Sequence, residues 1–191
     1  VVAVGIVGIA AIDSSRSLTL GGVTQYVWTT NAANHKYHNW YGYGAVNAQA
    51  AVSAAQSYTL NSLGTWVTSS SSTGTINKVI NDVGTDNTTA AITDPSGSSG
   101  TVEFVRIQMF MSHAAPNRIG MRLVSPSGTV SNLLTPLSRI TTNPNNTSFY
   151  MGSEAFYGED MEGTWTIKFD DYYNDGIAAT ILGWNIDVYG H

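Results

Sequence analysis

The sequence predicts a mainly β protein, with a jelly-roll β-sandwich over residues 58–191 and a helical portion before it over residues 1–57. In the second half of the chain, short runs such as 164–169 and 183–189 alternate apolar and polar residues, as half-buried strands do. Turns rich in Gly, Pro and Asn separate these runs. The first portion lacks this alternation and includes an alanine-rich segment, which favours helices.

Three helices are expected in the first portion. Residues 1–11 are apolar or small throughout, which is typical of a helix surrounded by protein. A second helix is expected from Leu18, because Leu18, Val23 and Val27 stand at spacings that a helix allows. Residues 45–56 are rich in alanine and predict the third helix.

The composition changes just after the alanine-rich segment. Residues 58–100 are rich in Ser, Thr, Gly and Asn but retain short apolar runs, so we expect strands and loops here and not a linker. Trp66, Trp165 and Trp184 stand in strand-like contexts and are predicted to lie in the core.

Charge and composition exclude several classes of function. The net charge is −5, with 8 basic and 13 acidic residues, so the chain lacks the basic surface that a nucleic-acid partner requires. It has no cysteine, which excludes disulfides and thiolate metal sites. The apolar run at residues 1–12 is shorter than the roughly 20 residues of a membrane span. It lacks the initial Met and basic region of a signal peptide, and we expect it to be buried against further protein from which the chain has been cut.

One family resemblance begins at residues 38–48, which read His-Asn-Trp-Tyr-Gly-Tyr-Gly-Ala-Val-Asn-Ala. The catalytic domains of kexin- and furin-like proteases end in a similar stretch, with a His, Tyr-Gly-Phe-Gly, an aliphatic residue and Asp-Ala. Here Tyr43 stands in place of the family's Phe, and Asn47 in place of its Asp.

The second half resembles the P-domain of the same proteases. The similar elements occur in the family's order: the strand 104–107, Ser112-His113, Leu-Val-Ser-Pro-Ser-Gly-Thr at 123–129, Gly158-Glu159, Gly163-Thr164-Trp165 and Gly183-Trp184. The chain departs from the family at 117–119, where Asn-Arg-Ile stands in place of Gly-Asp-Leu. If that Asp is a structural or calcium-binding carboxylate in relatives, its role is absent here or differently filled.

The resemblance implies the C-terminal region of a secreted subtilisin-like serine endopeptidase. Residues 1–57 would be the end of the catalytic domain, and residues 58–191 a P-domain that stabilises and regulates it. The implied partners are the N-terminal remainder of the catalytic domain and the protein substrates of the parent protease. The family's nucleophile lies in Gly-Thr-Ser-x-x-Ala-Pro, which this sequence lacks. No catalytic residue is therefore assigned, and the chain by itself is predicted to be inactive.

An acidic turn is the candidate metal site. Asp170, Asp171, Asn174 and Asp175 offer several oxygen ligands just before Gly176, and calcium prefers such ligands. The alternative is a solvated acidic turn between two strands. Because the spacing is not that of an EF-hand, calcium is a hypothesis that rests on composition alone.

A second function class stays open. Exposed aromatic residues at Trp40, Tyr41, Tyr172 and Tyr173 would form a sugar- or protein-binding patch, although packing in the core or between domains also explains them. The chain would then be a stand-alone jelly-roll module that binds glycan or fibrous protein, whereas a free module has no need of the catalytic-domain tail.

Overall fold

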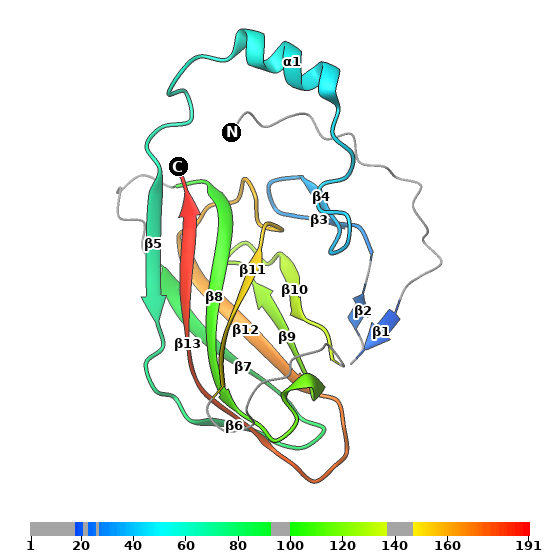
Figure 1. The fold of residues 1–191 in the computed structure, drawn as a ribbon. Coiled ribbons are helices and arrows are strands. Elements are labelled where there is room, and N and C mark those ends of the chain that lie inside the picture. Colours follow the sequence, from blue (N-terminus) through cyan, green and yellow to red (C-terminus); the bar gives the residue numbers. More distant parts are fainter. Residues whose placement is uncertain (1–17, 21–22, 26, 93–99, 137–146) are drawn as a thin grey trace.

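Two antiparallel sheets face each other in the computed structural model, which describes residues 18–20, 23–25, 27–92, 100–136 and 147–191 (Figure 1). The first sheet has the order β10 (Val130–Leu134), β9 (Ile119–Val124), β12 (Gly163–Asp171) and β7 (Thr85–Ile92). The second has the order β11 (Thr147–Ser153), β8 (Val102–Ser112), β13 (Ala179–Gly190) and β5 (Val67–Ser72), and β6 (Lys78–Ile80) also pairs with β13. A short 3-10 helix, η1 (Pro116–Arg118), joins β8 to β9. The predicted β-sandwich is confirmed.

The alternation read from the sequence matches the two sides of each strand. On β8, Val105, Ile107 and Met109 are buried, whereas Arg106 between them is exposed. The same alternation recurs on β12 and β13. Because successive side chains of a strand point to opposite faces, one face of each sheet supplies the core and the other faces outward.

The core lies between the sheets, and two tryptophans are completely buried in it, as predicted. The indole N–H of Trp184 on β13 donates to the hydroxyl of Thr88 on β7 at 2.6 Å, which links the two sheets. The indole N–H of Trp165 donates to the carbonyl of Met161 at 3.1 Å. The prediction for Trp66 is wrong: it is 58 % exposed, because it precedes β5 on the outward-facing side of an edge strand.

The first portion is only partly helical. Its elements are β1 (Leu18–Leu20), β2 (Val23–Gln25), β3 (Thr29–Thr30), β4 (Lys36–Tyr37) and α1 (Ala48–Ser57). The helix expected from Leu18 is wrong, since β1 and β2 pair there as antiparallel strands. Thr and Val are common in this stretch, and β-branched residues favour strands.

The third predicted helix is confirmed as α1. It begins after Asn47, whose side-chain oxygen accepts a hydrogen bond from the backbone N–H of Ala50 at 3.0 Å. The helix predicted at residues 1–11 lies outside the described residues, and the domain boundary at residue 57 stays a prediction. None of the described helices is long and apolar enough to cross a membrane.

Candidate functional site

A segment of the first portion is hydrogen-bonded to one end of the sandwich through Asn31, which is only 5 % exposed. Its side-chain amide donates to the carbonyls of Ala155 at 3.0 Å and Tyr157 at 2.8 Å. Its side-chain oxygen accepts from the backbone N–H of His35 at 2.8 Å. The Asn31 side chain therefore both shapes its own turn and fixes that turn to the sandwich.

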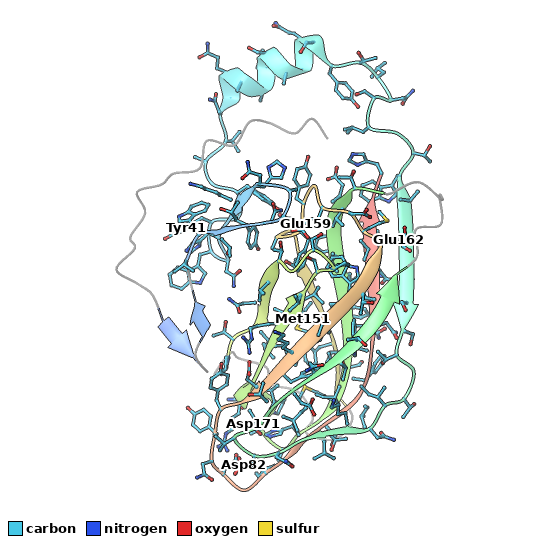
Figure 2. All side chains as sticks on the ribbon, turned by 180° about the vertical axis from the view of Figure 1, so that it is seen from behind. Tyr41, Asp82, Met151, Glu159, Glu162 and Asp171 are labelled. Atoms are coloured by element: carbon cyan, nitrogen blue, oxygen red, sulfur yellow. The ribbon has the colours of Figure 1, made fainter. Side chains whose placement is uncertain are left out.

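Beside this contact lies a buried carboxylate, Glu159, which is 3 % exposed (Figure 2). Its Oε1 accepts from the backbone N–H of Ala32 at 3.0 Å and from the hydroxyl of Thr129. Its Oε2 accepts from the hydroxyl of Ser125 at 2.6 Å. Within the described ranges, no Lys, Arg or His forms an ion pair with this carboxylate. Among these residues, the donors that compensate its burial are neutral, and one of them is the backbone N–H of Ala32 in the first portion.

Two sequence motifs thus meet at one group. The Ser-Pro-Ser-Gly-Thr turn brings Ser125 and Thr129 to the same side, because the backbone N–H of Thr129 donates to the Ser125 hydroxyl oxygen at 3.1 Å. The Gly-Glu pair supplies the carboxylate that both hydroxyls bind. We call this end of the sandwich, with residues 125–129 and 154–159, the docking end.

Gly158 allows the docked segment to approach closely. Its φ is +84°, in the left-handed region that favours glycine. A Cβ there would lie 3.0 Å from both the Cβ of Ala33 and the Nε2 of His35. The Gly-Glu pair is therefore a unit in which the glycine makes room for the segment and the glutamate binds it.

Aromatic rings extend the docking end. His35 lies 5.3 Å from the ring of Tyr157, and Tyr43 lies 5.8 Å from the same ring and 5.4 Å from Tyr37, measured between centroids. The hydroxyl of Tyr43 donates to the backbone carbonyl of Glu154. Burial raises the pKa of the Tyr43 phenol well above its usual value, and it also raises the pKa values of Tyr37 and Tyr157.

In contrast, α1 lies apart from the sheets (Figure 1) and buries none of its ten residues. Val52 on the helix is 58 % exposed, and Val46 and Leu60 on either side of it are 76 % and 82 % exposed. A helix of this length is marginal in water without tertiary packing. The exposed valines and leucine are therefore apolar side chains that the described part of the chain leaves open to solvent.

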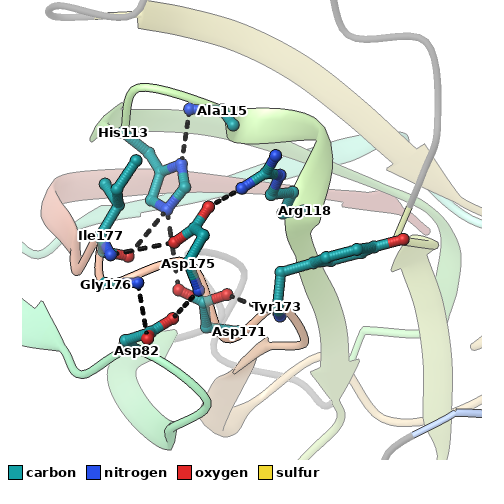
Figure 3. Close-up of polar contacts among 9 residues, drawn as sticks. All are labelled: Asp82, His113, Ala115, Arg118, Asp171, Tyr173, Asp175, Gly176 and Ile177. Atoms are coloured by element: carbon teal, nitrogen blue, oxygen red, sulfur yellow. Dashed lines mark hydrogen bonds and ion pairs between the residues drawn. The ribbon is translucent and has the colours of Figure 1, made fainter.

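The predicted metal ligands lie around Asp171, at the end of the sandwich opposite Glu159 (Figure 2). We call this the acidic end, and Figure 3 shows the contacts of Asp171 and Asp175 there. Asp170 forms an ion pair with Arg122, with its Oδ2 2.5 Å from Nη2. Its Oδ1 accepts from the hydroxyl of Thr85 at 3.1 Å. Asn174 is exposed. Asp170 is therefore part of a buried ion pair, whereas the Asn174 side chain faces solvent.

Asp171 is 5 % exposed and faces a buried histidine. Its Oδ1 accepts from the backbone N–H of Tyr173 at 3.3 Å, and its Oδ2 lies 3.6 Å from Nε2 of His113 without a hydrogen bond. Nδ1 of His113 accepts from the backbone N–H of Ala115 at 2.8 Å. Because Nδ1 accepts, the ring N–H is on Nε2, which is 3.3 Å from the carbonyl oxygen of Ile177.

Asp175 is held by Arg118, which forms an ion pair with its carboxylate and lies 5.1 Å from the ring centroid of Tyr173. Asp82, from a distant part of the chain, accepts from the backbone N–H groups of Asp175 at 3.3 Å and Gly176 at 2.8 Å. Arg118 therefore neutralises Asp175, and Asp82 fixes the backbone of the same turn.

The acidic end offers a poor fit to a metal ion. Among the described residues, no three His, Cys, Asp or Glu side chains are placed to hold one. Two guanidinium groups already neutralise Asp170 and Asp175. The unbonded Oδ2 of Asp171 is the one feature that favours a cation, and calcium at this turn stays a prediction.

Sequence reasoning did not assign functional roles to several residues that the structure brings together: Asn31, Asp82, Arg118, Ser125, Thr129 and Glu159. The Ser-Pro-x-Gly-Thr and Gly-Glu motifs can be recognised in the sequence, but the hydrogen bonds between them cannot be predicted from it. Ala32 and Glu159 are 127 positions apart, and no local spacing encodes such a contact.

The family follows from comparison with known proteins. Residues 102–188 match the family described as the proprotein convertase P-domain. Human proprotein convertase subtilisin/kexin type 6 is 28 % identical over 169 residues, which are 85 % of this chain and 17 % of that protein. The extracellular serine protease of Aeromonas sobria is 28 % identical over 175 residues, or 81 % of this chain and 27 % of that protein.

The fold is also shared with a solved structure. The crystal structure of the serine protease of Aeromonas sobria covers 92 % of this chain with a TM-score of 0.73 and 24 % identity, and this chain spans 36 % of it. Residues 102–188 therefore match the proprotein convertase P-domain, and the chain is related to kexin, furin and the Aeromonas protease. The chain spans only a small part of these relatives.

Proposed function

We propose that this chain is the C-terminal region of a secreted subtilisin-like serine endopeptidase, in which the P-domain stabilises and regulates the catalytic domain. Residues 1–57 would belong to the catalytic domain, and the catalytic Ser, His and Asp would lie in another part of the same protease. Three curated relatives support this: the Aeromonas protease, described as extracellular, and kexin and furin.

The observation that carries the proposal is the contrast between the two surfaces of the first portion. One surface is fixed to the P-domain by Asn31 and by the backbone of Ala32. The other, α1 with Val52 on it and Val46 and Leu60 on either side, is exposed to solvent. A segment that is bound on one side and uncovered on the other is suited to connect the P-domain to a further body of protein. We assign that body to the catalytic domain.

Stabilisation would follow from linkage. Every contact that exists only in the docked state adds to the free energy of unfolding of the catalytic domain. The buried carboxylate of Glu159 is one such contact, because it accepts from the backbone N–H of Ala32 in the segment. The hydroxyls of Ser125 and Thr129 hold the carboxylate in place from the P-domain side.

The test uses the full-length protease. Glu159→Ala should shorten the half-life of peptidase activity at elevated temperature several-fold, while kcat/KM at low temperature changes little. Lys168→Ala, on the exposed side of β12, is the matched control and should leave the half-life unchanged. An unaltered half-life in Glu159→Ala, or a full-length protein without peptidase activity, would contradict the proposal.

Calcium at Asp170, Asp171, Asn174 and Asp175 is a separate proposal. Its support is the oxygen-rich turn and the unbonded Oδ2 of Asp171; the nearby guanidinium groups oppose it. Calorimetry with calcium on chelator-treated protein decides the question. Absence of both heat and a rise in melting temperature would eliminate the site.

A further inference from the structure

The outer face of the second sheet carries an ordered set of polar and aromatic side chains. The strand register places Tyr150 opposite Gln108, Gln108 opposite Asn185, and Asn185 opposite Ser72. The side-chain amide of Asn185 donates to the side-chain oxygen of Gln108 at 3.2 Å. One row across four strands therefore presents a phenol, two amides and a hydroxyl.

The neighbouring row carries charges that cancel. Arg106 donates twice to Oδ2 of Asp187, from Nε at 3.0 Å and Nη2 at 2.8 Å. The hydroxyl of Ser70 donates to the other carboxylate oxygen at 2.6 Å. The Arg106 guanidinium also lies 5.6 Å from the ring centroids of both Tyr150 and Tyr189. Its orientation is thus fixed, and the row has no net charge.

A third row is aromatic. Tyr189 lies between Trp66, with centroids 6.4 Å apart, and Phe104, with centroids 6.1 Å apart. Both neighbouring rings are within about 30° of parallel to it. At Gly152 a Cβ would come within 2.4 Å of the Phe104 ring, so the glycine leaves room for that ring at the side of β11.

These rows are accessible to a ligand. Tyr150 is 62 % exposed and Trp66 is 58 % exposed. A shallow hollow of about 340 Å³ lies over β5 and β13 of the same sheet, and it is lined by Ser70, Ser71, Ser72, Asn185 and Asp187. Single exposed aromatic residues are common on protein surfaces, but several on one sheet face beside a polar hollow indicate an interaction surface.

The chemistry of the face selects its ligand. Because Arg106 and Asp187 neutralise one another, the described side chains of the three rows carry no unpaired charge to attract a charged ligand. Its amides and hydroxyls both donate and accept hydrogen bonds, which suits a ligand rich in hydroxyl groups. Its rings offer flat apolar area with polar edges. A pyranose ring has equatorial hydroxyls around an apolar C–H face, so it matches both properties.

We propose that this face, formed by Trp66, Phe104, Arg106, Gln108, Tyr150, Asn185, Asp187 and Tyr189, binds a neutral polysaccharide chain. The proposal goes beyond the stabilising role and does not depend on it, since none of these residues contacts Asn31 or Glu159 in the docking end. A polysaccharide-binding face would hold a secreted protease on a carbohydrate-rich matrix.

Two other macromolecules fit the face less well. A nucleic acid requires a surplus of cations, which the paired Arg106 does not provide. An extended peptide that adds to a sheet needs the free backbone groups of an edge strand, whereas Gln108 and Asn185 lie on the two central strands. A fibrous protein such as collagen is the competing outcome of the test.

The experiment measures retention of the 191-residue chain on washed microcrystalline cellulose, chitin and starch, and on collagen fibrils, by sedimentation. We expect retention on at least one of the three polysaccharides and about tenfold weaker binding for Tyr150→Ala and for Trp66→Ala, because one stacked ring contributes roughly the energy of that factor. Both side chains are largely exposed, so unchanged melting temperatures will show that the variants fold.

Trp40→Ala is the matched control. Trp40 is another exposed aromatic residue, at 53 % exposure, and it lies in the first portion of the chain and not on this sheet. It should be retained like the unaltered chain. No retention on any polysaccharide, equal retention of all variants, or retention on collagen alone would each overturn the proposal.

Discussion

The two ends of the sandwich bury carboxylates by different means. At the docking end, the described partners of Glu159 are neutral: two hydroxyls and the backbone N–H of Ala32. At the acidic end, Asp170 is paired with the guanidinium of Arg122. Both carboxylates are nearly inaccessible to water, so each must be compensated by its partners.

The docking end is a contact between two distant segments of the chain, whereas the acidic end is formed within the sandwich alone. The neutral donors at Glu159 come from a turn of the sandwich and from a segment about a hundred residues or more away in the chain. The cations of the acidic end come from η1 and β9, within the sandwich itself. We therefore expect the docking end to respond to loss of the first portion and the acidic end to be independent of it.

The largest expected effect is that of Asp170→Asn. The amide has nearly the same shape but no charge, so the Arg122 guanidinium is left with a buried, uncompensated charge. Unpairing a buried ion pair of this kind lowers the free energy of unfolding by about 3 kcal/mol. Urea unfolding of the purified chain measures the change.

Asp187→Asn is the matched control for that substitution. It removes the carboxylate charge from another Arg–Asp pair, Arg106–Asp187, in which the side chain of Arg106 is 47 % exposed. Exposed pairs contribute about 1 kcal/mol or less. A loss in Asp170→Asn no greater than in this control would show that the acidic end does not depend on its ion pair.

A smaller effect is expected for Glu159→Gln. The hydroxyls of Ser125 and Thr129 can rotate to accept from the new amide group, whereas a guanidinium has no such freedom. We expect a loss of about 1 kcal/mol in the free energy of unfolding, against about 3 kcal/mol for Glu159→Ala, which leaves several donors without an acceptor. Equal losses in both variants would mean that the charge, and not the hydrogen-bond geometry, matters at the docking end.

The smallest effect depends on pH. Burial raises the pKa of Tyr43 above its ordinary value of 10.0, so the folded state prefers the neutral phenol. The stability from this preference is complete below pH 10 and is lost as the pH rises above it, because the phenolate cannot donate to the Glu154 carbonyl.

Tyr43→Phe tests this point. It should remove part of the alkaline loss of stability, and it should lower the free energy of unfolding at neutral pH by about 1 kcal/mol, the value of one hydrogen bond. Part of the loss will stay, because the pKa values of Tyr37 and Tyr157 are raised as well. Melting curves between pH 7 and pH 11 measure it; an unchanged profile, equal to that of exposed Tyr150→Phe, would refute the assignment.

Local patterns were enough for the strands and for part of the core. The alternation at 164–169 predicted which side of β12 is buried, because a strand places successive side chains on opposite faces. Trp165 and Trp184 were predicted in the core for the same reason. The spacing of Leu18 and Val23 led to the wrong prediction of a helix, since a few apolar residues fit a helix and a strand equally well.

By itself, the sequence determined the β-sandwich, the third helix and the resemblance to P-domains, because all of these are written in local periodicity and in short motifs. Only the tertiary structure decided that Trp66 lies on an outer face, that Arg118 neutralises Asp175, and that Glu159 receives the backbone of Ala32. These contacts join residues far apart in the chain, and whether a side chain is buried, paired or exposed depends on neighbours that only folding brings together.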